Sequence, residues 1–184
     1  MRHPNIATRE NTTMVVIDVQ EKLFPAISEK QAALDNMRIC IETAKLFGLP
    51  VVATEQYPQG LGPTIPEVQE VLPPCPVISK VHFSCFGSDE FTDTLAKTGA
   101  QNLIIVGIET HICVAQTSLD ALARGYKVFT IGDATSSRTR ANWSFGLDKM
   151  RQAGVMVSST EAMLYEIAER AATEEFKALL KLVK

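Results

Sequence analysis

The chain has 184 residues, of which 46% are hydrophobic and 21% are charged, and this is enough apolar material for a single domain, 1–184, around one large core. Its formal net charge is −3 and its Lys and Arg residues are scattered, so we expect neither a nucleic acid nor a membrane as a partner. The first residues, 1–14, are polar and no apolar run is long enough to span a bilayer, so we expect a cytoplasmic protein with reduced cysteines.

Short apolar runs alternate with helical patterns along the chain, which is typical of βαβ units around a parallel sheet. The runs are rich in β-branched residues and are apolar nearly throughout, as strands covered on both faces should be. In chain order, we expect strands at 14–18, 51–54, 77–80, 103–107, 128–132 and 155–158. The sequence therefore predicts an α/β fold, a three-layer α/β/α Rossmann-like domain with a central six-stranded, mostly parallel sheet.

Apolar residues at helical spacing fill the intervals between these strands. A helix is expected over 34–44, and the Pro- and Gly-rich segment 57–76 is expected to be a loop with a short helix near 66–71. Further helices are expected at 91–97, 114–123, 143–150 and 173–183. We expect left-handed C-terminal caps at Gly48, Gly99, Gly125 and Gly154. The apolar stripe of the last helix should pack on the domain or on another subunit.

Three residues that can take part in chemistry follow strands of the predicted sheet. Asp18 ends the first strand, Lys80 ends the third, and Cys113 follows the fourth at the start of a helix. Ligands of open α/β sheets bind outside the carboxyl ends of the strands, so these side chains are expected to converge. Each one alone has an ordinary explanation, because charged residues often end strands in solvent and free cysteines are often core residues. Together they provide a base, a cation and a nucleophile.

Three separated stretches resemble the signature motifs of the isochorismatase-like cysteine hydrolases, a family that includes nicotinamidases and N-carbamoylsarcosine amidohydrolase. The stretches are 16–20 (VIDVQ), 79–80 (SK) and 107–114 (GIETHICV), in the family's order and spacing. The segment 54–64 looks most like the isochorismatase domain-containing proteins of unassigned substrate. The resemblance covers nearly the whole chain and implies a catalytic triad of Asp18, Lys80 and Cys113.

This resemblance implies that Asp18 takes the proton of the Cys113 thiol and that Lys80 stabilises the resulting charge. A helix N-terminus and a nearby cation lower the pKa of a thiol, so we expect Cys113 to be an activated nucleophile. It would attack a carbonyl carbon, release ammonia or an amine, and form a thioester that water hydrolyses. The family also implies a cis peptide bond between Ile108 and Glu109 and an oxyanion hole formed by the backbone N–H groups of Glu109 and Cys113.

The chain departs from better-known family members at their metal site. Nicotinamidases have an Asp-x-His pair and further histidines beside the pocket, whereas this chain has Glu55, Gln56 and Tyr57 in the corresponding stretch and only three histidines in all. We therefore expect no metal ion, no other cofactor and no nicotinamide substrate. Isochorismatase proper acts on a vinyl ether and lacks the cysteine, so Cys113 favours a small amide-like or other carbonyl substrate.

Residues near the ends of the predicted strands are expected to contact this small-molecule substrate. They are Gln20, Phe24, Gln56, Tyr57, His82, Phe83 and His111. A catalytic dyad of His111 with Cys113 is not favoured, because residues so close in a turn rarely point at one atom. Other interpretations stay open: a domain that binds a metabolite or a protein without turnover, a vinyl-ether hydrolase, or a redox-responsive thiol. Many relatives assemble into dimers or larger rings, so we expect a homo-oligomer.

Overall fold

The computed structural model describes residues 2–183 and contains one six-stranded sheet in the order β3-β2-β1-β4-β5-β6. Every strand pairing is parallel, which confirms the predicted α/β fold with its central parallel sheet. The strands are β1 (Thr12–Ile17), β2 (Val51–Gln56), β3 (Val77–Lys80), β4 (Asn102–Ile108), β5 (Lys127–Ser136) and β6 (Met156–Ser158).

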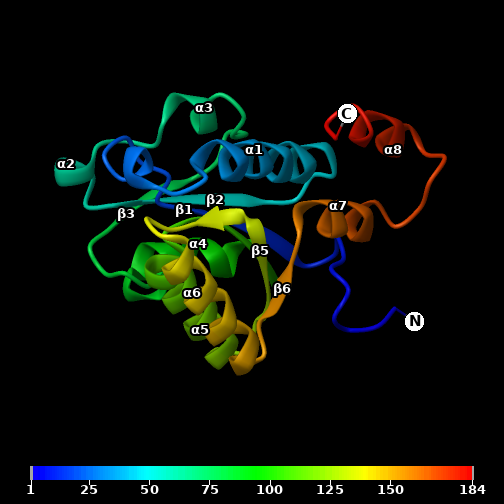
Figure 1. Cartoon of the computed structure of the whole chain (residues 1–184). Helices are drawn as coiled ribbons and strands as arrows, with labels where there is room; N and C mark the ends of the chain where they lie inside the picture. Colours follow the sequence, from blue (N-terminus) through cyan, green and yellow to red (C-terminus); the bar gives the residue numbers. More distant parts are fainter. Residues whose placement is uncertain (1, 184) are drawn as a thin grey trace.

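Helices cover both faces of the sheet, so the domain has three layers (Figure 1). One layer contains α1 (Lys30–Leu46), α3 (Pro66–Gln69), α7 (Thr160–Ala168) and α8 (Glu174–Leu179). The opposite layer contains α4 (Asp89–Lys97), α5 (Ala115–Ala123) and α6 (Arg140–Ala153). Short helical segments occur at α2 (Pro58–Leu61), Phe24–Ala26, Cys85–Gly87 and Thr110–Val114. In the described part of the chain, every helix is too short or too polar to traverse a bilayer.

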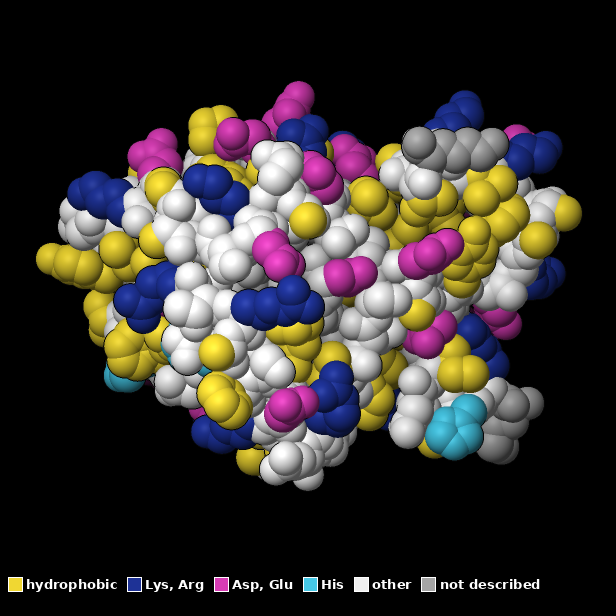
Figure 2. All heavy atoms as spheres, viewed as in Figure 1, with side chains coloured by type: hydrophobic (Ala, Val, Ile, Leu, Met, Phe, Trp, Pro, Cys, Tyr) yellow, Lys and Arg dark blue, Asp and Glu magenta, His cyan; other side chains and the backbone are white. Residues whose placement is uncertain are grey.

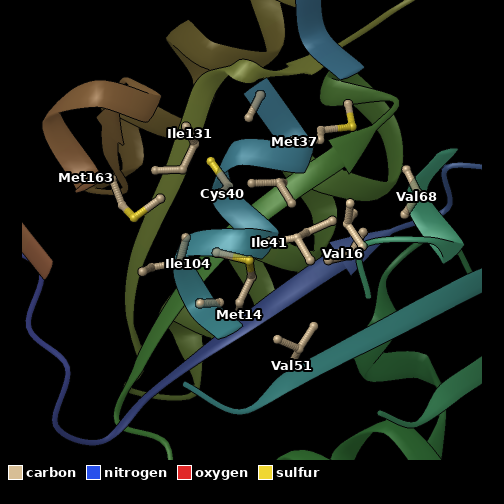
Figure 3. Close-up of a cluster of buried hydrophobic side chains, with 14 of the residues drawn as sticks. Met14, Val16, Met37, Cys40, Ile41, Val51, Val68, Ile104, Ile131 and Met163 are labelled. Atoms are coloured by element: carbon tan, nitrogen blue, oxygen red, sulfur yellow. The ribbon is translucent and has the colours of Figure 1, made fainter. Parts of the chain in front are cut away.

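Side chains that alternate along each strand fill two apolar clusters, one on each face of the sheet. In β1, Met14 and Val16 pack toward α1, whereas Val15 and Ile17 pack toward α4, α5 and α6. Figure 3 shows the first cluster, in which the α1 side chains Cys40 and Ile41 lie over the sheet. This burial on both faces explains why the strands are apolar at nearly every position.

The predicted helix ends are found where the sequence signals are strongest. Gly48, Gly99, Gly125 and Gly154 all have positive φ after α1, α4, α5 and α6, which confirms the four predicted caps. The Thr173 hydroxyl accepts a hydrogen bond from the Phe176 N–H at the start of α8. Helix α8 packs on its own domain, because Leu179 is buried in the cluster that contains α1. Helix α7, capped by Ser159, was not among the predicted helices.

The chain order of the strands reverses between β1 and β4, the two central neighbours of the sheet. Strands β2 and β3 lie on one side of this pair, and β5 and β6 lie on the other side. Connections therefore leave the carboxyl ends of β1 and β4 in opposite directions, and in open α/β sheets this switch point is where ligands bind. Asp18 follows β1 and Cys113 follows β4, so the topology brings both residues to the switch point.

Candidate active site

The strand register brings the ends of four neighbouring strands to one level. Ile17 lies opposite Thr54 of β2 and Gly107 of β4, and Gln56 lies opposite Lys80 of β3. Because side chains alternate along a strand, Lys80 points to the same face as Ile78, which belongs to the apolar cluster that contains Cys113. The register therefore places Asp18, Lys80 and Cys113 at one edge and one face of the sheet.

Asp18 is fully buried and has a left-handed backbone conformation, with a φ of 53°. Its carboxylate is held by two donors: the Thr54 hydroxyl donates to Oδ1 at 2.7 Å and the Lys80 ammonium donates to Oδ2 at 2.7 Å. Positive φ is uncommon for residues other than glycine and clusters at functional sites. The turn after β1 thus fixes the carboxylate against side chains of β2 and β3.

The Lys80 ammonium lies within hydrogen-bond distance of four oxygens. Besides Asp18 Oδ2, these are Gln56 Oε1 at 2.8 Å and the carbonyl oxygens of His82 at 3.2 Å and Phe83 at 3.3 Å. Burial lowers the pKa of Lys80, but the Asp18 carboxylate and nearby thiol groups together raise it above its ordinary value. The side chain of Lys80 has no exposed area and its ammonium is bonded to Asp18 and Gln56, so the charge has a fixed position in the site.

Cys113 lies inside the π-helical turn Thr110–Val114, which directly precedes α5, rather than at the regular helix start that the sequence predicts. Burial and the nearby Asp18 carboxylate raise the pKa of the Cys113 thiol, and the opposing effect of Lys80 is smaller. The prediction of a lowered thiol pKa is therefore wrong for the free protein. The negative charge of Asp18 disfavours a thiolate at Cys113, so the thiol of the free protein stays protonated.

Helix α6 packs against the turn that contains Cys113. A Cβ atom at Gly146 would lie 2.9 Å from His111 Cα and 3.0 Å from the Thr110 carbonyl carbon, so only glycine allows this approach. The His111 ring bonds through Nδ1 to the buried Ser137 hydroxyl at 3.0 Å. His111 is therefore tied to the loop after β5 as well as to α6.

Glu109 anchors the start of the same turn. The peptide bond between Ile108 and Glu109 is cis, as the resemblance implied. The Glu109 carboxylate accepts hydrogen bonds from Arg138 N at 2.9 Å and Arg138 Nε at 3.1 Å, and only the arginine of this pair is largely exposed. Sequence analysis did not assign Arg138 or Thr54 to the site. A polar residue at the end of an otherwise apolar strand was the available signal for Thr54, and Arg138 has no comparable signal.

The predicted substrate-contacting residues fall into three groups by their burial. Gln20 and Gln56 are buried and their side-chain amides are bonded to protein groups, as described below. Tyr57, His82 and Phe83 are exposed, and Tyr57 and His82 line a cavity of about 290 Å³ that extends along β3 to Lys80. Phe24 and His111 are half-buried. A role in substrate contact stays a prediction for all seven.

Two further buried thiols give the protein a testable pH dependence. Burial raises the pKa of Cys40 to about 12 and that of Cys85 to about 11, from 9.0. A thiol whose folded pKa is raised stabilises the fold fully below its unfolded pKa and loses this effect as the pH rises toward its folded pKa. Between about pH 9 and 11, each thiol should lower the free energy of unfolding by roughly 1.4 kcal/mol per pH unit.

Urea denaturation at several pH values in this range measures the slope. The Cys40→Ala variant should show a slope that is shallower by the contribution of one thiol. Equal slopes in the variant and the unmodified protein would contradict the assignment to buried thiols.

An open parallel sheet with polar residues at its switch point defines an α/β domain of the class that acts on ligands at the carboxyl ends of its strands. The model of the Isochorismatase domain family matches residues 12–162. The chain is 35% identical to the secreted isochorismatase effector Isc1 of Phytophthora sojae, over 95% of this chain and 85% of that protein. It is 33% identical to isochorismatase domain-containing protein 2 of Danio rerio, over 95% and 87% of the two chains.

Among solved structures, the MAR1 ribonuclease of Caenorhabditis elegans superposes with a TM-score of 0.90. It is 36% identical to this chain, and the match covers 96% of this chain and 91% of that one. The chain therefore belongs to the isochorismatase-like hydrolase family.

Proposed function

We propose that this protein is a metal-free cysteine hydrolase that cleaves the C–N bond of a small amide-like molecule through a thioester at Cys113. The observation that carries the proposal is the buried Asp18–Lys80 ion pair, 2.7 Å long, whose two charges both act on the Cys113 thiol. A buried ion pair is costly to desolvate and is not needed to stabilise an apolar sheet edge. Its position beside a thiol supports a catalytic use.

The raised pKa of Cys113 favours a mechanism in which the thiol is deprotonated during attack. The sulfur forms a bond to the substrate carbonyl carbon as its proton passes to the Asp18 carboxylate. Asp18 then donates this proton to the nitrogen as the C–N bond breaks, which leaves a thioester and free ammonia or an amine. Water attacks the thioester, gives a proton to Asp18, and the proton returns to the departing sulfur.

Lys80 has one role in this scheme: its fixed ammonium compensates the negative charge on sulfur while the proton is on Asp18. The oxyanion of each tetrahedral intermediate would accept hydrogen bonds from the backbone N–H groups of Glu109 and Cys113. The Arg138 contacts on the Glu109 carboxylate support this role, because they fix the residue that bears one of the two donors. A fixed donor of this kind contributes roughly a hundredfold to a thousandfold in rate.

Three properties of the protein stay predictions. Self-association is favoured by large apolar side chains on the surface, among them Phe145 at 72% and Val81 at 68% exposure. The second is a cytoplasmic location, although the Phytophthora sojae relative is a secreted protein. The third is a small-molecule substrate. The solved Caenorhabditis elegans relative is called a ribonuclease, but we do not propose this activity here. On the face shown in Figure 2, Lys and Arg are interspersed with Asp and Glu, whereas binding of a nucleic acid backbone requires a cluster of positive charge.

Intact-protein mass spectrometry with a panel of small primary amides and N-carbamoyl compounds tests the proposal. A productive compound should release its amine and add its acyl mass to Cys113, and the Asp18→Asn variant should form little of this adduct, because the thiol has lost the base that takes its proton. The Cys113→Ser variant should bind the same compound and form no thioester. Hydrolysis that persists in Cys113→Ser would overturn the proposal in favour of another nucleophile. Binding to the unmodified protein with no amine released from any compound would overturn it in favour of binding without turnover.

A further inference from the structure

We propose that Gln56 is a positioning residue that holds the Lys80 ammonium at its place between Asp18 and the loop after β3, and not a substrate-contacting residue. This inference rests on the proposed function of the site. Gln56 ends β2 and lies directly opposite Lys80 in the sheet register. Its side-chain oxygen accepts a hydrogen bond from Lys80 Nζ at 2.8 Å, and its side-chain nitrogen donates to the Val81 carbonyl oxygen at 2.8 Å.

The two partners of the Gln56 amide determine its orientation. An ammonium can only donate a hydrogen bond and a carbonyl oxygen can only accept one, so the amide oxygen must face Lys80 and the amide nitrogen must face Val81. Both ends of the amide are therefore used within the protein, and the residue is only 9% exposed. A substrate could bond only to the second N–H or the second lone pair of this amide, and the burial of Gln56 restricts access to both.

Gln20 immobilises the backbone of Gln56 from the other side. Its side-chain oxygen accepts from the Gln56 N–H at 2.8 Å, and its side-chain nitrogen donates to the carbonyl oxygens of Gln56 at 3.0 Å and Gly62 at 2.7 Å. Gln20 belongs to the turn that contains Asp18, because its own N–H donates to the Asp18 carbonyl oxygen at 2.9 Å. The pair of glutamines thus connects the Asp18 turn to the Lys80 loop through buried hydrogen bonds.

This connection has a chemical consequence for Lys80. An ammonium has three N–H groups, and the Asp18 carboxylate, the Gln56 amide and two carbonyl oxygens are available to accept from them. Every acceptor stabilises the protonated form, so Lys80 acts as a charge and not as a proton donor. Without the Gln56 oxygen, the remaining acceptors are Asp18 and the two more distant carbonyl oxygens, so the ammonium would shift toward them and its charge would move relative to the Cys113 sulfur. Because Lys80 lowers the pKa of Cys113, the thiol would become harder to ionise.

Alkylation of Cys113 by iodoacetamide tests the inference in the intact protein without a known substrate. The rate is followed by peptide mass spectrometry across a pH series for the unmodified protein and for the Gln56→Leu, Gln56→Met and Gln56→Glu variants. We expect the pH profile of the Leu and Met variants to shift upward and the rate at a fixed pH to fall at least about threefold, since a half-unit rise in thiol pKa has this effect. The Glu variant keeps an acceptor but adds a buried negative charge, so its profile should shift further.

Gln152→Leu, at an exposed position of α6, is the matched control and should leave the profile unchanged. Circular dichroism and thermal unfolding identify the variants that fold, and rates are compared among those. A residue that only stabilised the loop would change the melting temperature and leave the profile of the folded variants unmoved. If the profile of the folded Gln56 variants is unmoved while that of Lys80→Met is shifted, the positioning role of Gln56 is overturned and the proposed function stands. An unmoved profile in Lys80→Met as well would overturn both.

Any substrate found for the enzyme adds a second readout. The positioning role predicts a lower kcat with a nearly unchanged KM in Gln56→Met, because the ammonium acts on the reacting sulfur. A higher KM with an unchanged kcat would instead assign Gln56 to substrate contact and overturn the inference.

Discussion

Replacement of Lys80 by Met is expected to lower the free energy of unfolding by about 3 to 5 kcal/mol, because it leaves the Asp18 carboxylate buried without its counter-ion. Neither side chain of the pair has any exposed area, so solvent cannot compensate the lone charge. The same variant should reduce turnover by roughly a hundredfold or more, since the charge opposite the sulfur is lost. Urea denaturation near neutral pH measures the first effect, and amine release from a productive substrate measures the second.

The double variant, Asp18→Asn together with Lys80→Met, separates the two effects. The Asp18→Asn substitution replaces the carboxylate by a neutral amide whose oxygen could still accept the Thr54 hydrogen bond, so the double variant should be more stable than Lys80→Met alone. It should remain inactive, because neither the base nor the cation is present. A double variant that is less stable than Lys80→Met would show that the lone charge is not the cause of the destabilisation.

The sheet could be predicted from sequence because its strands are buried on both faces, and such strands have an unmistakable apolar composition. The predicted ends of the strands were less accurate where polar residues extend the pairing with the neighbouring strand. β1 begins at Thr12, whose polar side chain is buried beside β4, and β5 continues to Ser136 because Thr135 and Ser136 still pair with β4. Strand ends are predicted from apolar composition and from turn residues, and neither of these signals identifies a buried polar residue as part of a strand.

The meeting of Asp18 with Lys80 could also be predicted, because the carboxyl ends of parallel strands lie at one edge of a sheet. The pKa of Cys113 could not. It depends on the balance of burial and Asp18 against Lys80, and these effects have opposite signs and depend on distances that no spacing along the chain defines. The roles of Gln20 and Gln56 were equally inaccessible. Residues at strand ends can point to a ligand or to each other, and here each of the two bonds to backbone or side-chain groups of the protein.

The close contact between β4 and β1 gives the second large prediction, for Gly107→Ala. Gly107 has a φ of +121°, and a Cβ atom there would lie 2.6 Å from the Ile17 N atom and 2.9 Å from the Ile17 carbonyl carbon. These are backbone atoms of the central strand, so they cannot rotate away as a side chain could. We expect Gly107→Ala to lower the free energy of unfolding by about 3 to 5 kcal/mol, from backbone strain and steric overlap together.

Gly125→Ala is the matched control for this prediction, because Gly125 also has a positive φ, +86°, but nothing lies within 4 Å of its added Cβ. Its cost should be limited to backbone strain, about 1 to 2 kcal/mol. The difference between the two variants in urea denaturation therefore measures the steric overlap at Ile17. Because Ile17 precedes Asp18, a displaced β1 should also misplace the carboxylate, and the Cys113 alkylation profile should change in Gly107→Ala only. Equal destabilisation by both substitutions would mean that β1 and β4 can move apart at little cost. The close packing of these strands would then not explain the position of Asp18.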